Sequence, residues 1–88
     1  MKISQSQLQP GDLILIAKQA NLVIGKVSHI TASGSVKYSF YDKYRDKENA
    51  SNFYYDINTS DNFNKTAYIP KPYQPEYERF FWLLKRED

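Results

Sequence analysis

The chain has 88 residues, a formal net charge of +2 and no cysteine. A chain of this length forms one domain with a small core, and without cysteine it has no disulfide bond, zinc–thiolate site or thiol nucleophile. Its stability must come from packing, to which the aromatic residues, 16% of the chain, contribute large buried areas.

Charge and hydropathy argue against a strongly basic nucleic-acid-binding domain, a membrane-spanning protein and a secreted protein. Twelve basic residues stand against ten acidic ones, which is a small excess for a nucleic-acid-binding domain. No segment approaches the roughly 18 apolar residues of a membrane-spanning helix, and residues 1–5 lack the apolar run of a signal peptide. We therefore expect a cytoplasmic protein without a membrane partner. Nine lysines against three arginines, with many Asn, Ile and Tyr, are typical of an AT-rich bacterial or phage genome.

The first half of the chain predicts three strands. After a turn at Pro10–Gly11, residues 13–17 form a short apolar run of the kind found in buried strands. A polar loop follows, and residues 22–30 are rich in β-branched side chains, with Gly25 indicating a bulge or bend. Residues 36–40 then show the clearest alternation of polar and apolar side chains in the chain.

This alternation makes a specific prediction about burial. Successive side chains of a strand point to opposite faces, so Val36, Tyr38 and Phe40 should be buried while Lys37 and Ser39 are exposed. The same reasoning applied to the other strands predicts the core. Its expected members are Leu13, Leu15, Val23, Val27, Val36, Tyr38, Phe40, Phe53, Tyr55 and Ile57.

The second half of the chain is less regular. Residues 42–52 are charged and polar and predict a loop or a single helical turn. Alternation at residues 53–57 predicts a fourth strand, and residues 66–69 predict a short fifth one. Three prolines within residues 70–75 then interrupt any regular structure.

The C-terminal segment, residues 74–88, fits two structures. Pro75 followed by Glu76 resembles the first turn of a helix, and Lys85 with Arg86 suits a helix end. The run Phe80–Leu84 also has the composition of a buried strand. We favour the helix, so that residues 10–69 form the β domain proper and residues 70–88 form a proline-rich linker and an aromatic appendage.

Several short strands with tight turns predict a small β-barrel. The segments Pro10-Gly11-Asp12, Gly25-Lys26-Val27 and Phe40-Tyr41-Asp42-Lys43-Tyr44 resemble the strand entry, second strand and corner of SH3-like barrels of the Tudor and KOW kind. This resemblance extends over residues 10–44. It implies a mostly β fold, a small SH3-like barrel of about five strands, with a C-terminal helix or strand appendage.

The resemblance also implies two kinds of binding site. Tudor-like domains hold a methylated lysine or arginine between aromatic rings, and the matching corner supplies Tyr41 and Tyr44, although the facing loop has no aromatic residue. KOW-type barrels bind RNA, and Lys26, Lys37 and Lys43 with the two tyrosines form a candidate face for phosphate attraction and base stacking. Ordinary surface lysines and tyrosines would give the same pattern.

The sequence predicts no metal site, no cofactor and no catalytic residue. Oxygen-bearing side chains alternate over residues 56–64 like the start of a calcium loop, but Asp61 and Ala67 stand where that loop requires glycine and glutamate. His29 is the only histidine and lies in an apolar strand, where a structural role is commoner than that of a general base. Nucleophile-elbow and phosphate-loop motifs do not occur.

The aromatic C-terminal segment is the leading candidate for a binding surface. Its side chains exceed what one face of one element buries in a small domain, so we expect Phe80 and Leu84 to cap the core and the others to meet another chain. The alternative is burial of the whole segment against the barrel. The expected partner-binding residues are Tyr77, Phe81, Trp82 and Leu83.

These observations favour a non-catalytic protein-interaction or adaptor module, encoded by a phage or another mobile element. Its expected partner is another protein or a second copy of the chain. The alternative is a small β-barrel that binds RNA or DNA without sequence specificity.

Overall fold

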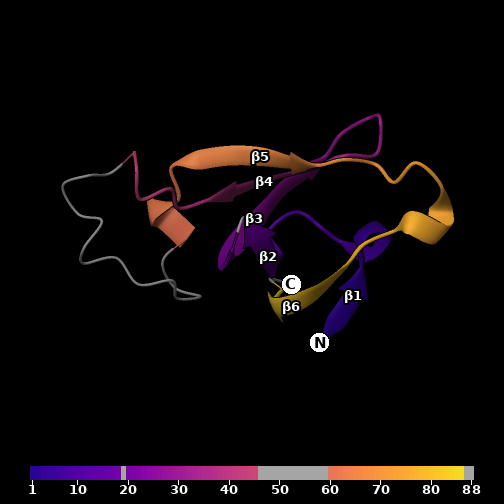
Figure 1. Cartoon of the computed structure of the whole chain (residues 1–88), viewed down its shortest axis with the longest axis horizontal. Helices are drawn as coiled ribbons and strands as arrows, with labels where there is room; N and C mark the ends of the chain where they lie inside the picture. The colour runs from indigo at the N-terminus through magenta and orange to yellow at the C-terminus, as the bar shows by residue number, and fades with distance from the viewer. Residues whose placement is uncertain (19, 46–59, 87–88) are drawn as a thin grey trace.

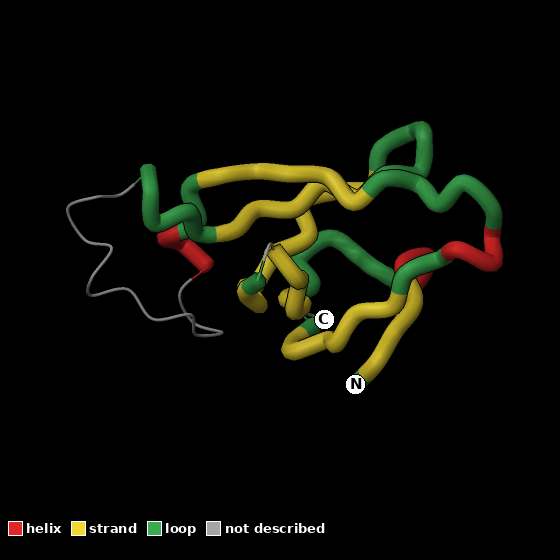
Figure 2. Tube along the Cα trace, in the orientation of Figure 1, coloured by secondary structure: helices red, strands yellow, loops and turns green. Residues whose placement is uncertain are grey.

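The computed structural model describes residues 1–18, 20–45 and 60–86, which form a mostly β domain (Figures 1 and 2). The six strands are antiparallel and form one sheet in the order β1-β6-β2-β3-β4-β5. Three-residue 3-10 turns are the only helical elements of the described residues, and none is long or apolar enough to cross a membrane. The strands are β1 (Lys2–Ser4), β2 (Leu13–Lys18), β3 (Asn21–Ile30), β4 (Val36–Phe40), β5 (Lys65–Ile69) and β6 (Phe80–Lys85), and the turns are η1 (Gln5–Gln7), η3 (Ser60–Asn62) and η4 (Pro75–Tyr77).

The sheet is strongly curved, with β4 and β5 at one end, β1 and β6 at the other, and β2 and β3 between them (Figure 1). Its two edge strands, β1 and β5, do not pair with each other, so the sheet is open. Curvature lets the inner faces of both ends share one core to which every strand contributes. The buried members of this core are Ile3, Leu8, Ile14, Ile16, Val23, Val27, Val36, Tyr38, Phe40, Ile69 and Phe81.

The strands predicted at residues 13–17, 22–30, 36–40 and 66–69 are confirmed. Val36, Tyr38 and Phe40 are buried as predicted, whereas Lys37 and Ser39 are half-buried rather than exposed, because β4 lies between β3 and β5. The predicted fourth strand and its core residues Phe53, Tyr55 and Ile57 lie outside the described residues.

The register of β2 differs from the prediction. Ile14 and Ile16 point into the core, while Leu13 and Leu15 lie on the outer face of the sheet. Leu13 is nevertheless buried there, and Leu15 is half-buried. Every residue from 13 to 17 is apolar, so the pattern has no period that could distinguish the two faces.

Gly25 has a different role from the predicted bulge. The irregularity in β3 lies between Val27 and His29, where pairing with β4 shifts register. Gly25 instead faces the core at a close approach of neighbouring side chains. A Cβ atom at this position would lie 2.5 Å from Cδ1 of Ile16 and 3.1 Å from Cδ2 of Tyr38, so no larger residue fits without repacking.

The predicted C-terminal helix is wrong, because residues 80–85 form the strand β6. This strand lies between β1 and β2 and pairs with both. The helix-start signal at Pro75 belongs to the short turn η4. Alternation along β6 buries Phe81, which is 9% exposed, and turns Phe80 and Trp82 outward, with 58% and 55% of their surfaces exposed. Phe80 therefore does not cap the core.

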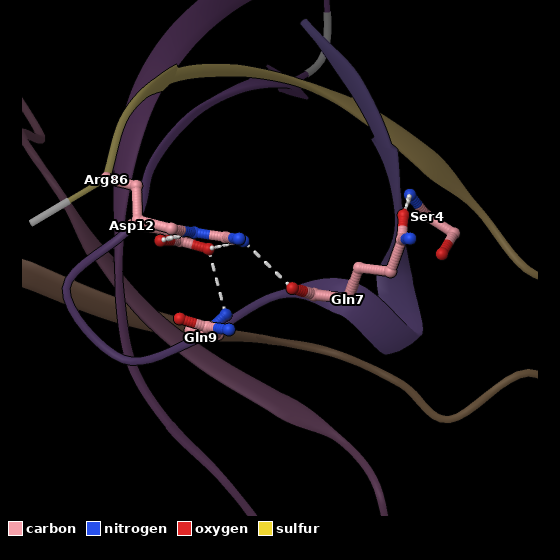
Figure 3. A network of polar contacts seen from close by, with 5 residues as sticks. All are labelled: Ser4, Gln7, Gln9, Asp12 and Arg86. Carbon is pink, nitrogen blue, oxygen red and sulfur yellow. Dashed lines mark hydrogen bonds and ion pairs between the residues drawn. The ribbon is translucent and has the colours of Figure 1, made fainter. Parts of the chain in front are cut away.

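An ion pair between a fully buried carboxylate and an arginine side chain that is 29% exposed joins the end of β6 to the start of β2 (Figure 3). The Asp12 side chain is fully buried, and Arg86 grips it with two parallel bonds, from Nε to Oδ1 at 2.9 Å and from the terminal guanidinium nitrogen to Oδ2 at 2.8 Å. The Gln9 backbone N–H also donates to Oδ2, and Arg86 donates to the Gln7 carbonyl oxygen. Bidentate pairs of this kind combine charge with fixed geometry.

The register of β6 predicts that replacing its two phenylalanines lowers the stability of the domain by different amounts. Phe81→Ala should lower the free energy of unfolding by about 3–5 kcal/mol, since it empties a core position, whereas Phe80→Ala should lower it by less than about 1 kcal/mol. Urea unfolding followed by circular dichroism measures both. Equal losses for the two variants would mean that the alternation of β6 is not as described.

The Asp12–Arg86 pair predicts a large effect from a change near the C-terminus. Arg86→Ala should lower the free energy of unfolding by about 3–5 kcal/mol, because it leaves the buried Asp12 carboxylate without its countercharge. Arg86→Lys keeps the positive charge but loses the bidentate geometry of the guanidinium group. Its free energy of unfolding should therefore lie between that of Arg86→Ala and that of the original chain. A loss below about 1 kcal/mol for Arg86→Ala, as for an ordinary surface ion pair, would contradict the buried pair.

Candidate functional site

An apolar surface lies on the outer side of the sheet, where β6, β2 and β3 run side by side. Trp82 of β6 pairs with Leu15 of β2, which pairs in turn with Ile24 of β3, so the three side chains form a row on one face. Phe80, two residues before Trp82, shares this face. We call it the Trp82 face, and define it by Leu15, Ala17, Leu22, Phe80 and Trp82.

Buried apolar side chains lie next to the Trp82 face on the same side of the sheet. Leu13 and Ile24 are buried on this side of the sheet, although they do not belong to the core cluster on its inner side. A hollow of about 590 Å³ lies at the end of the β2–β6 pairing, next to the Leu15–Trp82 pair. Its walls are Leu15, Ile16, Ala17, Leu22, Arg79, Phe80, Phe81 and Trp82. A hollow with such walls suits an apolar side chain from a second molecule.

The structure separates the four residues predicted to bind a partner. Trp82 and Tyr77 are exposed, but Tyr77 lies on η4 and does not line the hollow. Phe81 is buried and Leu83 packs against the core cluster. Sequence reasoning missed Phe80, and the signal that identifies it is its spacing of two from Trp82 once the segment is treated as a strand.

The predicted aromatic cage and nucleic-acid face is not brought together as one site. Tyr41 is 2% exposed, whereas Tyr44 is 76% exposed. Both line a second hollow of about 480 Å³ with Lys43, but Lys26 and Lys37 do not line it. These two lysines lie on β3 and β4, on the outer side of the sheet.

The lysines around this second hollow already have partners. The Lys18 ammonium group lies 4.5 Å from the ring centroid of Phe40, and that of Lys43 lies 5.5 Å from the ring centroid of Tyr44. Lys65 approaches a carboxylate oxygen of Asp42 at 3.4 Å. Part of the positive charge is therefore used within the domain.

Two hydrogen bonds between the side-chain amide of Asn64 and the backbone of Asp42 hold the chain beside this hollow. The Asp42 N–H donates to Oδ1 of Asn64 at 2.7 Å, and Nδ2 of Asn64 donates back to the Asp42 carbonyl at 3.1 Å. The Asn64 amide thus acts as a strand partner and joins the two ends of the segment that connects β4 to β5. This contact fixes the corner from which Lys43 and Tyr44 project.

A third hollow, of about 730 Å³, separates the β3–β4 turn from the segment before β6. Gln5 in its wall is buried, and its Nε2 donates to the Pro70 carbonyl at 2.9 Å. Its Oε1 has no hydrogen-bond partner among the residues that the structure describes. Glu78 accepts the Ser6 N–H, and hydrogen bonds from the side chain and backbone of Ser6 lower the pKa of Glu78. These polar contacts attach η1 to the chain on either side of η4.

His29 is exposed on β3, with its Nδ1 3.4 Å from the hydroxyl oxygen of Ser28. No cluster of three or more carboxylate or imidazole groups suited to a metal ion occurs within residues 1–18, 20–45 and 60–86. Much of the calcium-like stretch, residues 56–59, lies outside the described part of the chain.

Comparison of the chain with protein-family models, with curated proteins and with solved structures gave no match in any of the three. The function must therefore be inferred from the geometry of the chain itself. Among the three hollows described, the one beside the Trp82 face is alone in having two exposed rings in its wall, those of Phe80 and Trp82.

Proposed function

We propose that this chain is a non-catalytic protein-interaction module of the cytoplasm that binds its partner through the Trp82 face. The observation that carries the proposal is the outward position of Phe80 and Trp82 beside an apolar hollow. Leaving two large rings in water costs free energy that burial against a partner recovers. Tryptophan in particular is enriched among the residues that contribute most to protein–protein binding.

We also propose that the fold is a small SH3-like barrel. The motifs that carry the resemblance support this, because two of them touch: the Gly11 N–H donates to the Val27 carbonyl, and the Val27 N–H donates to the Asp12 carbonyl. The order of the strands supports it as well. Strands β2 to β5 form a meander, and β6 returns to pair with β2, as the last strand of a small barrel does.

Substitution of Trp82 tests the proposed function. Trp82→Glu should keep the fold, since the residue points into solvent, and should weaken partner binding by about 30-fold or more, as loss of an interface anchor does. Tyr73→Glu is the matched control, because Tyr73 is 91% exposed and lies away from the Trp82 face. Affinity capture from a nuclease-treated extract of the source organism, with circular dichroism of each variant, compares the three chains.

The proposal requires proteins that the original chain and Tyr73→Glu both retain and Trp82→Glu loses. Sedimentation velocity of the pure chain detects the case in which the partner is a second copy. If Trp82→Glu is folded and retains the same proteins as the original chain, the Trp82 face is not the binding surface.

Nucleic-acid binding is the second candidate, and the observation that favours it is the hollow lined by Lys18, Lys43, Lys65 and the exposed ring of Tyr44. Lysines beside an exposed ring combine phosphate attraction with base stacking. Fluorescence anisotropy of labelled single-stranded RNA and DNA tests it over a series of salt concentrations. Binding that falls steeply with salt and is lost in Tyr44→Ala supports this function, and absence of binding at low salt rejects it.

A further inference from the structure

We propose that the partner of the Trp82 face is an acidic segment of another protein, with an apolar side chain that enters the hollow and carboxylates on either side of it. This inference rests on the proposed function and adds the chemistry of the partner. It follows from the charges that surround the apolar surface.

Every charged side chain in the four strands that build and flank this face is a lysine. Strands β1, β2, β3 and β6 contain Lys2, Lys18, Lys26 and Lys85 and no aspartate or glutamate. Lys18 lies on the inner side of the sheet, over the ring of Phe40, so Lys2, Lys26 and Lys85 are the lysines beside the Trp82 face. Lys2 lies directly across from Trp82 in the pairing of β1 with β6. Lys26 and Lys85 lie across from Leu13 on its two sides. Arg79 forms part of the wall of the hollow.

Within residues 1–18, 20–45 and 60–86, the acidic residues that lie nearest to these strands along the chain are Asp12 and Glu78, and both have partners elsewhere. Asp12 is fully buried and paired with Arg86. Glu78 accepts a hydrogen bond from the Ser6 backbone and lines the third hollow, between η1 and the β3–β4 turn. Among the described residues, no carboxylate forms an ion pair with Lys2, Lys26 or Lys85. Complementary charge on a partner would steer it to this face.

A second copy of the chain fits this surface poorly. In a two-fold symmetric dimer the same patch meets itself, so the positively charged patch of one copy, with Lys2, Lys26 and Lys85, would meet the positively charged patch of the other. Like charges placed together across an interface oppose association. The occupant must bring negative charge, which this face does not supply.

A nucleic acid also brings negative charge, but the rings are not arranged for base stacking. The Lys2 ammonium group lies 5.2 Å from the ring centroid of Phe80 and covers one face of that ring. The hollow beside it has only two exposed rings in its wall, Phe80 and Trp82, and its other exposed or half-buried apolar residues are the aliphatic Leu15, Ala17 and Leu22. Nucleic-acid grooves stack successive bases on aromatic side chains, whereas an aliphatic hollow takes a single apolar side chain.

A display experiment tests the partner's chemistry directly. A library of random dodecapeptides is selected for binding to the full chain and depleted on Trp82→Glu. We expect the retained peptides to be enriched in Asp and Glu beside an aromatic or branched aliphatic residue. A synthetic peptide from this set should bind about tenfold more weakly to Lys26→Glu/Lys85→Glu, and should lose affinity with added salt. Lys43→Glu/Lys71→Glu has the same net charge, lies away from the Trp82 face and should bind like the original chain.

Other outcomes overturn the inference in distinguishable ways. Retained peptides that are neutral or basic would leave the Trp82 face as a docking surface and refute the acidic partner. A library that yields no peptide dependent on Trp82 would refute a peptide-binding face altogether. Two competing occupants, nucleic acid and membrane, are tested with oligothymidylate and with vesicles of phosphatidylserine and phosphatidylcholine. If the selection yields no acidic peptides and one of these probes binds in a Trp82-dependent way, the face is assigned to nucleic acid or to membrane accordingly.

Discussion

The ion pair between Asp12 and Arg86 fixes the arrangement on which the rest of the structure depends. The pair joins the end of β6 to the start of β2, with the Asp12 carboxylate fully buried and gripped by two bonds. A change in the register of β6 would separate Arg86 from Asp12, and the unpaired charge left in the interior would be strongly destabilising. A shift of one residue along β6 would exchange its two faces and bring Phe81 out and Trp82 in. The interaction that stabilises the core therefore also places the binding surface.

The same strand serves the core and the proposed site because its two faces are both apolar. Phe81 and Leu83 pack inward, and Phe80 and Trp82 point outward. Strand β2 repeats this arrangement, with isoleucines inward and Leu15 outward. Sheets that face water on one side normally alternate apolar and polar residues. Two adjacent strands that depart from this rule give the domain an apolar outer face, and Lys2 of β1, Lys26 of β3 and Lys85 of β6 give the surroundings of that face their charge.

The sequence predicts the parts of this fold that have a clear period. Val36, Tyr38 and Phe40 could be assigned to the core because polar residues separate them. Phe80–Leu84 could not be assigned to helix or strand, since a continuous apolar run has no period and its partner β1 is only three residues long, with one buried apolar residue, Ile3. Trp82 was identified as a candidate anchor from composition. The lysines around Trp82 could not be identified from the sequence, because cross-strand neighbours depend on the register of the strands, and register is a property of the folded sheet.

The central claim, that Trp82 is held in solvent in the free chain, can be tested by one measurement, since Trp82 is the only tryptophan. The measurement is its fluorescence emission in dilute solution, with quenching by iodide and acrylamide, compared with the unfolded chain in urea. Our account predicts emission close to that of a solvated indole and quenching by both agents in the folded state. Blue-shifted emission that neither agent quenches, unchanged on dilution, would mean that Trp82 is buried within the domain, and the proposed binding surface would not exist.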